Sequence, residues 1–206
     1  MSFFKEIMQK PWLPPEDDVV SDLSGAMAMS TAPARVALRL FLAVVGVLFS
    51  LFCVAYYIRM ELADWRPLAE PTLVWINTAV ILLSSAALQY TRHAVQRGNV
   101  GGMNAGLVAG GLLTLGFLVG QYMGWQELRA AGYYAASNPA NAFFYLLTAV
   151  HGLHLIGGLF VWGRTTLKVW RGAEPYQVRL SVELCTTYWH FLALVWLVIL
   201  WILIST

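Results

Sequence analysis

Five long stretches of the chain are apolar along their whole length and contain no Asp, Glu, Lys or Arg. A helix rises about 1.5 Å per residue, so roughly 20 apolar residues are needed to cross a hydrocarbon core about 30 Å thick. Each stretch has about this length, and none shows the broad polar face of a helix from a soluble protein. The pattern therefore predicts an all-α integral membrane protein, a bundle of five transmembrane helices at residues 40–58, 72–91, 103–126, 141–163 and 184–205.

Basic residues between these stretches are unequally divided between the two sides of the membrane. Because the more basic side faces the cytoplasm, we expect a cytoplasmic N-terminus and a periplasmic C-terminus. One side carries ten Lys and Arg residues, namely Lys5, Lys10, Arg35, Arg39, Arg92, Arg97, Arg164, Lys168, Arg171 and Arg179. The other side carries three, namely Arg59, Arg66 and Arg129.

The first 34 residues differ from the rest of the chain because they have no sustained apolar period and contain proline and acidic residues. We expect residues 1–34 to be a cytoplasmic tail, either mobile or bound to a partner. Residues 35–206 then form the five-helix transmembrane domain. Its cytoplasmic loops are expected at 92–102 and 164–182.

Composition narrows the class of protein. Hydrophobic residues make up 59% of the chain and charged residues 12%, which excludes an ordinary soluble domain. A formal net charge of +2 is too small to indicate nucleic-acid binding. The two cysteines, Cys53 and Cys185, exclude a disulfide scaffold, and the chain has no cysteine–histidine spacing typical of zinc sites.

Small residues recur in the third apolar stretch. Lipid does not drive helices together by the hydrophobic effect, so helices associate where small side chains let their backbones approach. The glycines could also line a smooth path for a substrate, but we expect tight helix packing. The two stripes are Gly102, Gly106 and Gly110, followed by Gly116, Gly120 and Gly124.

Several polar residues lie within the apolar stretches, where an unpaired polar group is costly and is therefore a functional candidate. His151 and His154 are three residues apart and share a helix face. Similar predicted depths would allow His154 to meet His190 across a helix pair. Glu183 follows Ser181 at the expected start of the fifth helix, where it would complement the helix dipole. The candidates are Asn77, Gln89, Gln121, His151, His154, Glu183 and His190.

Three interpretations of these histidines compete: haem ligation, a proton relay and an interhelical polar clamp. His154 and His190 could supply one pair of haem ligands from facing helices. The four histidines of the chain are too few at one depth for a catalytic iron or copper centre. We favour the clamp, in which neutral imidazoles bond between helices and fix their register.

Two segments carry a resemblance to a known family. Residues 143–158 read FFYLLTAVHGLHLIGG, and residues 183–196 read ELCTTYWHFLALVW. These runs resemble two signatures of subunit III of the haem-copper cytochrome c oxidases, in the same order. Asn77 and Thr78, followed by Arg92, His93 and Gly98, are similar to a third region of that family. The resemblance covers about residues 70–206.

The resemblance implies a non-redox accessory subunit in the cytoplasmic (inner) membrane of a bacterium. Such a subunit has no catalytic residue and no metal of its own. Subunit I, its direct partner, carries haem and copper, while subunit II and possibly small subunits complete the complex and cytochrome c donates the electrons. The subunit stabilises subunit I, supports access of oxygen and protons, and binds phospholipid. Carried over by position, the lipid-binding residues are His93, Lys168 and Arg171, and the intramembrane polar cluster is His151, His154, Glu183 and His190.

Two positions depart from the family pattern. Gly124 stands where the family usually has a membrane Glu, and Ala193 stands where many members have Asp. The Glu-dependent proton role proposed for the family is therefore not carried over, whereas lipid binding and support of subunit I are.

Other functions stay open. Subunit III of a quinol oxidase and the related accessory protein of nitric oxide reductases fit the same residues. A haem-binding membrane anchor would use His154 and His190. A small transporter is disfavoured because the chain lacks inverted repeats and interrupted helices.

Overall fold

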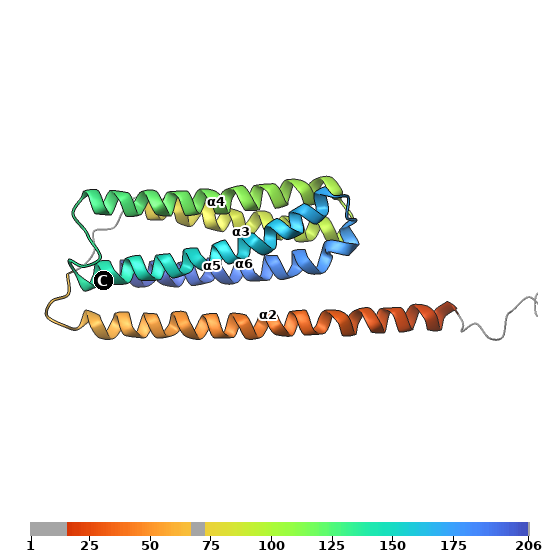
Figure 1. Cartoon of the computed structure of the whole chain (residues 1–206), viewed down its shortest axis with the longest axis horizontal. Coiled ribbons are helices and arrows are strands. Elements are labelled where there is room, and N and C mark those ends of the chain that lie inside the picture. Colours follow the sequence, from red (N-terminus) through yellow and green to blue (C-terminus); the bar gives the residue numbers. More distant parts are fainter. Residues whose placement is uncertain (1–15, 67–72, 206) are drawn as a thin grey trace, which may run out of the picture. The chain divides into compact units, whose positions relative to one another are not determined.

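Apart from the turns between helices, the chain is helical wherever the structure, a computed structural model, describes it. It describes residues 16–66 and 73–205, with side chains from Pro33 onward, and these residues contain no strand. The prediction of five spans is confirmed, because five helices are long and apolar enough to cross a membrane. They are α2 (Glu16–Met60), α3 (Leu73–Gln96), α4 (Val100–Ala130), α5 (Pro139–Trp170) and α6 (Pro175–Ile204), as Figure 1 shows.

The chain divides into two compact units, residues 1–40 and 41–206. Helix α2 already begins at Glu16, inside the segment predicted as a tail. The sequence Ala26-Met27-Ala28-Met29 is rich in strong helix formers, which favours helix without any apolar period. Residues 1–15 of the predicted tail lie outside the described residues.

The turns between helices are much shorter than the predicted loops at 92–102 and 164–182, which are mostly helical. Helical hydrogen bonding continues past the apolar stretch into charged residues, since charges limit a membrane span but not a helix. At the end of α3, the amide of Asn99 donates to the carbonyl of Ala94 at 2.9 Å. Three helices end in this way at a glycine with positive φ, a conformation that favours glycine; these are Gly98, Gly132 and Gly172.

The position at which α6 begins corrects one expectation about Glu183. Helix α6 begins at Pro175, and Glu174 caps it in a capping box with Gln177. Glu183 is therefore more than two turns inside the helix, and the expectation that it complements the dipole at the helix start was wrong.

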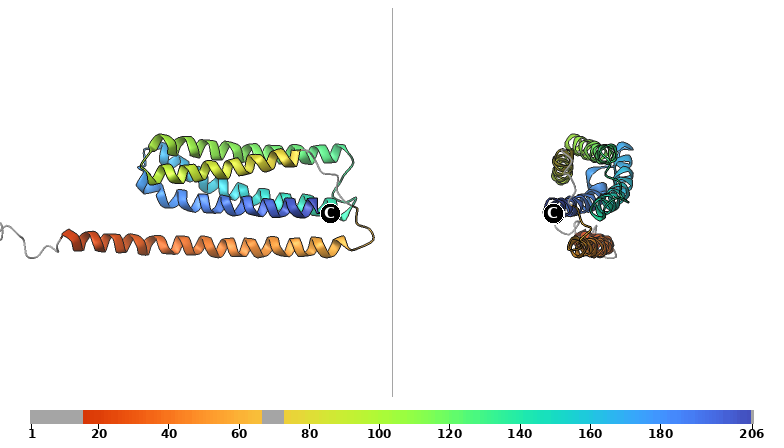
Figure 2. Two further views of the ribbon diagram at one scale, coloured as in Figure 1. Left: turned by 180° about the vertical axis from the view of Figure 1, so that it is seen from behind. Right: turned by 90° about the vertical axis from the view of Figure 1, so that its left-hand side faces the viewer.

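Helix α3 packs against α4 and α6, and α5 packs against α6 and α4. Figure 2 shows these four helices end-on. Glycines make the close approaches: a Cβ at Gly106 would lie 2.3 Å from Thr91 Oγ1, and a Cβ at Gly111 would lie 2.1 Å from the Trp162 ring. Both positions need glycine for packing. Gly106 belongs to a predicted stripe and agrees with the expectation, whereas Gly111 lies outside both stripes. Gly124 is different, because no atom lies within 4 Å of the Cβ position there.

Candidate functional site

Two tryptophans of α6 form the polar centre of the bundle. Trp189 Nε1–H donates to Thr114 Oγ1 on α4 at 2.9 Å, and Trp196 Nε1–H donates to Thr78 Oγ1 on α3 at 3.0 Å. Ser84 Oγ lies 2.7 Å from Thr114 Oγ1, so three helices meet at this threonine. Indole combines a large apolar surface with one donor, which suits a buried contact with a hydroxyl group.

His151 lies in the same core and is fully buried, with 0% of its surface exposed. Its Nε2–H donates to the carbonyl of Leu192 on α6 at 3.1 Å. The imidazole lies between Phe117 and Trp196, with ring centroids 5.6 and 5.2 Å away. Among the described residues, Nδ1 has no hydrogen-bond partner. His151 thus ties α5 to α6 through one nitrogen.

His154 makes different contacts, one turn farther along α5. Its Nδ1–H donates to the carbonyl of Val150 in its own helix at 2.7 Å. The ring packs against Phe49 of α2, with centroids 5.6 Å apart. The backbone carbonyl of His154 accepts the hydroxyl of Tyr188 at 2.9 Å, so the link to α6 runs through the main chain.

His190 of α6 faces α3 and belongs to a chain of four polar side chains. Ser85 Oγ lies 2.5 Å from His190 Nδ1, and His190 Nε2 lies 3.1 Å from Gln89 Oε1. The amide nitrogen of Gln89 lies 3.1 Å from His93 Nε2. We call Ser85, His190, Gln89 and His93 the polar ladder.

Donor and acceptor roles in the polar ladder follow from the amide of Gln89. Its oxygen can only accept, so His190 carries its proton on Nε2, and Nδ1 of neutral His190 then accepts from Ser85. Its nitrogen can only donate, so neutral His93 accepts on Nε2 and carries its proton on Nδ1. Every bond therefore points from Ser85 toward His93.

This arrangement distinguishes a clamp from a proton relay. An amide cannot pass a proton along a chain without changing to its unfavourable imidic tautomer, and Gln89 stands between the two imidazoles. Both nitrogens of His190 are already bonded to α3. The polar ladder is therefore suited to holding α3 and α6 in register.

Glu183 lies one turn nearer the α6 N-terminus than Thr186 and faces Arg92, with 3.8 Å between Oε1 and the guanidinium. Thr186 donates to the carbonyl of Leu88 on α3 at 3.2 Å. These contacts continue the α3–α6 seam toward the turns at the ends of α3 and α5.

The predicted polar cluster is thus brought together only in part. His151 and His154 share a helix, as their spacing predicts. His190 and Glu183 both contact α3, whereas His154 bonds within α5. The meeting of His154 with His190 that their depths would allow is not formed, because periodicity gives the face of a helix but does not say which neighbour that face meets.

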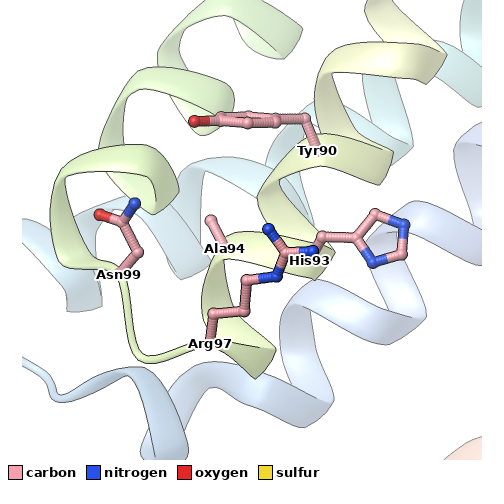
Figure 3. Close-up of a pocket in the computed structure, with 5 residues that line it drawn as sticks. All are labelled: Tyr90, His93, Ala94, Arg97 and Asn99. Carbon is pink, nitrogen blue, oxygen red and sulfur yellow. The ribbon is translucent and has the colours of Figure 1, made fainter.

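The three predicted lipid-binding residues lie at one end of the bundle, where the α3–α4 and α5–α6 turns are (Figure 1). His93 lines a pocket of about 250 Å³ with Tyr90, Ala94, Arg97 and Asn99 (Figure 3). Lys168 and Arg171 are exposed at the end of α5 and do not line this pocket. The structure therefore joins His93 with Arg97.

Sequence reasoning missed the polar groups that pair with the deep histidines and tryptophans. Ser84, Ser85, Thr78 and Thr114 are buried in apolar stretches. The adjacent serines are the signal that could have identified α3 as the partner of α6, since hydroxyl groups at membrane depth seek partners on neighbouring helices.

Within residues 33–66 and 73–205, no three His, Cys, Asp or Glu side chains are grouped so that they could hold a metal ion. Cys53 is partly buried, Cys185 is buried, and both are free thiols.

Comparisons with known proteins agree on one family. The sequence profile described as cytochrome c oxidase subunit III matches residues 26–205. A probable cytochrome c oxidase subunit 3 of Mycobacterium leprae is 33% identical over 139 residues, 65% of this chain and 67% of the relative. The protein of the same description from Nocardia farcinica is 31% identical over 155 residues, 71% of this chain and 74% of the relative. For that of Mycobacterium tuberculosis H37Rv the match is 33% over 124 residues, 58% of this chain and only 59% of the relative's length.

Proposed function

Because this chain belongs to the cytochrome c oxidase subunit III family, we propose that it is the non-redox accessory subunit of a bacterial aerobic haem-copper oxidase. In this role it packs directly against subunit I, stabilises it during turnover and supports access of oxygen and protons. Haem and copper are held by partner subunits. The single observation that best supports a structural role is the use of His151 and His190 as bonds between helices.

In this proposal, cytochrome c donates electrons to the complex. The complex also contains subunit II and can contain small subunits. The names of the relatives, cytochrome c oxidase subunit 3, favour cytochrome c over quinol or nitric oxide chemistry. The match covers only part of each relative. The choice of cytochrome c as donor therefore rests on membership of the family and not on similarity over the full length of the relatives.

The proposed location is the bacterial inner membrane, with the N-terminus in the cytoplasm and the C-terminus in the periplasm. Its support is the excess of basic residues on one side. The bacterial source of the Mycobacterium and Nocardia relatives agrees with it.

Phospholipid binding at the cytoplasmic end forms a further part of the proposal, with His93, Lys168 and Arg171 as ligands of the phosphate. All three side chains are exposed at the same end of the bundle. Lys168 and Arg171 are cations that bind phosphate through charge-assisted hydrogen bonds, and the Nδ1–H of His93 adds a donor.

The test is to purify the complex through an affinity tag on this chain and to record its haem spectrum and subunit composition. We expect haem-containing subunits to copurify and the separated chain to be colourless. Recovery of this chain alone with stoichiometric metal, or as a stable protein without an oxidase around it, would contradict the proposal.

A second measurement compares His190→Leu with His154→Leu in the intact complex. His190→Leu removes the bonds between α6 and α3 and should speed the loss of oxidase activity during turnover, whereas His154→Leu removes a bond within α5 and should have a smaller effect. The haem content per complex should stay constant in both. Loss of haem from complexes that assemble to the same level would instead assign a ligand role to these residues.

A further inference from the structure

The outer side of the α3–α6 pair carries polar groups where a membrane helix normally carries apolar ones. We call this side the α3–α6 face and define it by Ala86, Gln89 and His93 of α3 and Thr187, His190 and Leu197 of α6. Gln89 is half-buried and the other five side chains are exposed. The face therefore includes three of the four residues of the polar ladder.

The α3–α6 face has hydrogen-bond donors that lack acceptors in the described part of the chain. Gln89 donates one amide hydrogen to His93, and His93 carries its proton on Nδ1. Within the part of the chain that the structure describes, neither the second amide hydrogen of Gln89 nor the Nδ1–H of His93 has an acceptor. The half-exposed guanidinium of Arg92 adds further donors beside them. The face thus offers donors and needs acceptors.

The depth of the α3–α6 face in the membrane determines which acceptors can reach its donors. His190 lies seven residues beyond Glu183, where the uncharged stretch of α6 begins, which is about 10 Å inside that stretch at 1.5 Å per residue. Gln89 bonds His190 and lies at the same level. A phospholipid offers only hydrocarbon at this depth, because its phosphate and ester oxygens lie at the interface. A protein helix can present an acceptor there.

A second copy of this chain is the alternative occupant. A two-fold symmetric contact through the α3–α6 face would bring the same patch of both copies together, with the half-exposed guanidinium of Arg92 in one copy toward that of the other, and like-charge repulsion disfavours this contact. Apolar contact is available alongside the donors, since Leu197 and the neighbouring Leu194 are 41% and 59% exposed.

From these observations we propose that the α3–α6 face docks a transmembrane helix of another oxidase subunit, one that presents a hydrogen-bond acceptor to Gln89 and apolar side chains to Leu197. This inference rests on the proposed function, because it needs a membrane partner, and it names the surface that the partner contacts.

The first experiment places the photo-crosslinking residue p-benzoylphenylalanine at Ala86 in cells that express the whole oxidase. Its control is the same replacement at Ala109, which is exposed on α4 at a similar distance from the α3–α4 turn. We expect light to join this chain to another oxidase subunit from position 86 and not from position 109. Adducts from position 86 with phospholipid only, or with a second copy of this chain only, would overturn the proposal.

The second experiment avoids a bulky probe and compares Gln89→Leu with Gln126→Leu. Gln126 is an exposed glutamine on α4 whose amide bonds Tyr122 of its own helix at 2.7 Å. Gln89→Leu also breaks the Gln89–His190 bond of the polar ladder, so Ser85→Ala, which breaks the ladder at buried Ser85 and keeps the amide of Gln89, is a second control. If lipid covers the face, Gln89→Leu retains as much partner as Ser85→Ala does. Our proposal predicts that Gln89→Leu lowers the amount of partner subunit retained in detergent about tenfold, as loss of one or two hydrogen bonds would, and that Gln126→Leu leaves it unchanged. Retention by Gln89→Leu equal to that of either control would overturn it.

Failure of this inference can be told apart from failure of the proposed function. If the tagged wild-type chain recovers no haem-containing subunit, the proposed function is wrong. If it recovers them while position 86 reports only lipid, the function stands and the docking surface is wrong.

Discussion

At the scale of single residues, the bundle depends on side chains that join a large apolar surface to one polar atom. Trp189 and Trp196 are the main examples, because their indoles donate to Thr114 and Thr78 at the centre of the four helices. Each hydrogen bond between membrane helices contributes on average only about 0.6 kcal/mol. Stability is therefore distributed over many such contacts, and close packing at glycine carries a larger share at individual positions.

Gly111→Ala tests that packing. Its Cβ would overlap the rigid indole of Trp162, which also donates to the carbonyl of Leu107 at 3.1 Å and so cannot turn away freely. We expect a loss of about 1–3 kcal/mol in unfolding free energy, typical of overpacking. Unfolding in mixed detergent measures it. Gly157→Ala is the control, because no atom lies within 4 Å of its Cβ position; equal effects of the two variants would refute the packing argument.

His151→Leu tests the clamp in the core. Leucine removes the bond to the Leu192 carbonyl but fills most of the volume between Phe117 and Trp196. We expect a loss of about 0.5–1.5 kcal/mol in unfolding free energy, the range for one internal hydrogen bond. The same detergent unfolding measures this loss, and the haem content of the assembled complex should not change. A loss of haem would assign His151 a role that the hydrogen bond does not explain.

At the scale of elements, the spans could be predicted and the helix ends could not. Apolar length is read directly from the sequence, which is why all five spans were found. Charges at Arg164 and Lys168 suggested that the fourth span ended near residue 163, yet α5 continues to Trp170. The stop signal is Gly172, whose φ is +89°.

Gly172→Ala should therefore destabilise the α5–α6 turn. An alanine at this φ costs about 1 kcal/mol, and hydrogen exchange of the amides around the turn should become faster. Gly163→Ala offers a control in the same helix, since nothing lies within 4 Å of its Cβ position. A slower or unchanged exchange at the turn in Gly172→Ala would show that the turn does not depend on the glycine.

The histidine cluster shows the same limit of sequence reasoning. The spacing of His151 and His154 gave their shared face correctly. The partners of His190 depend on which helix lies beside α6, and Ser85 and Gln89 lie about 100 residues away in the chain. Local patterns hold no information about such a pairing, so depth alone allowed a meeting of His154 and His190 that the structure does not contain.

At the scale of the whole molecule, the two ends of the bundle differ in charge, and the proposed lipid site lies at the basic end. Lys168→Gln with Arg171→Gln should lower the amount of anionic phospholipid that copurifies with the complex, because two phosphate-binding cations are lost. Lipid mass spectrometry measures this amount. Arg66→Gln with Arg129→Gln removes the same charge from the opposite end and should have no effect; unchanged lipid in the first double variant would rule the site out.

The contacts of α6 also bear on biosynthesis. Five of its side chains, Thr186, Tyr188, Trp189, His190 and Trp196, bond to helices that leave the ribosome earlier. Until α6 is synthesised, Thr78 and Thr114 lack their indole donors within the membrane. A nascent chain that stops before Pro175 would therefore hold incompletely paired polar groups in lipid, and the insertion of the last helix is the step that completes their pairing.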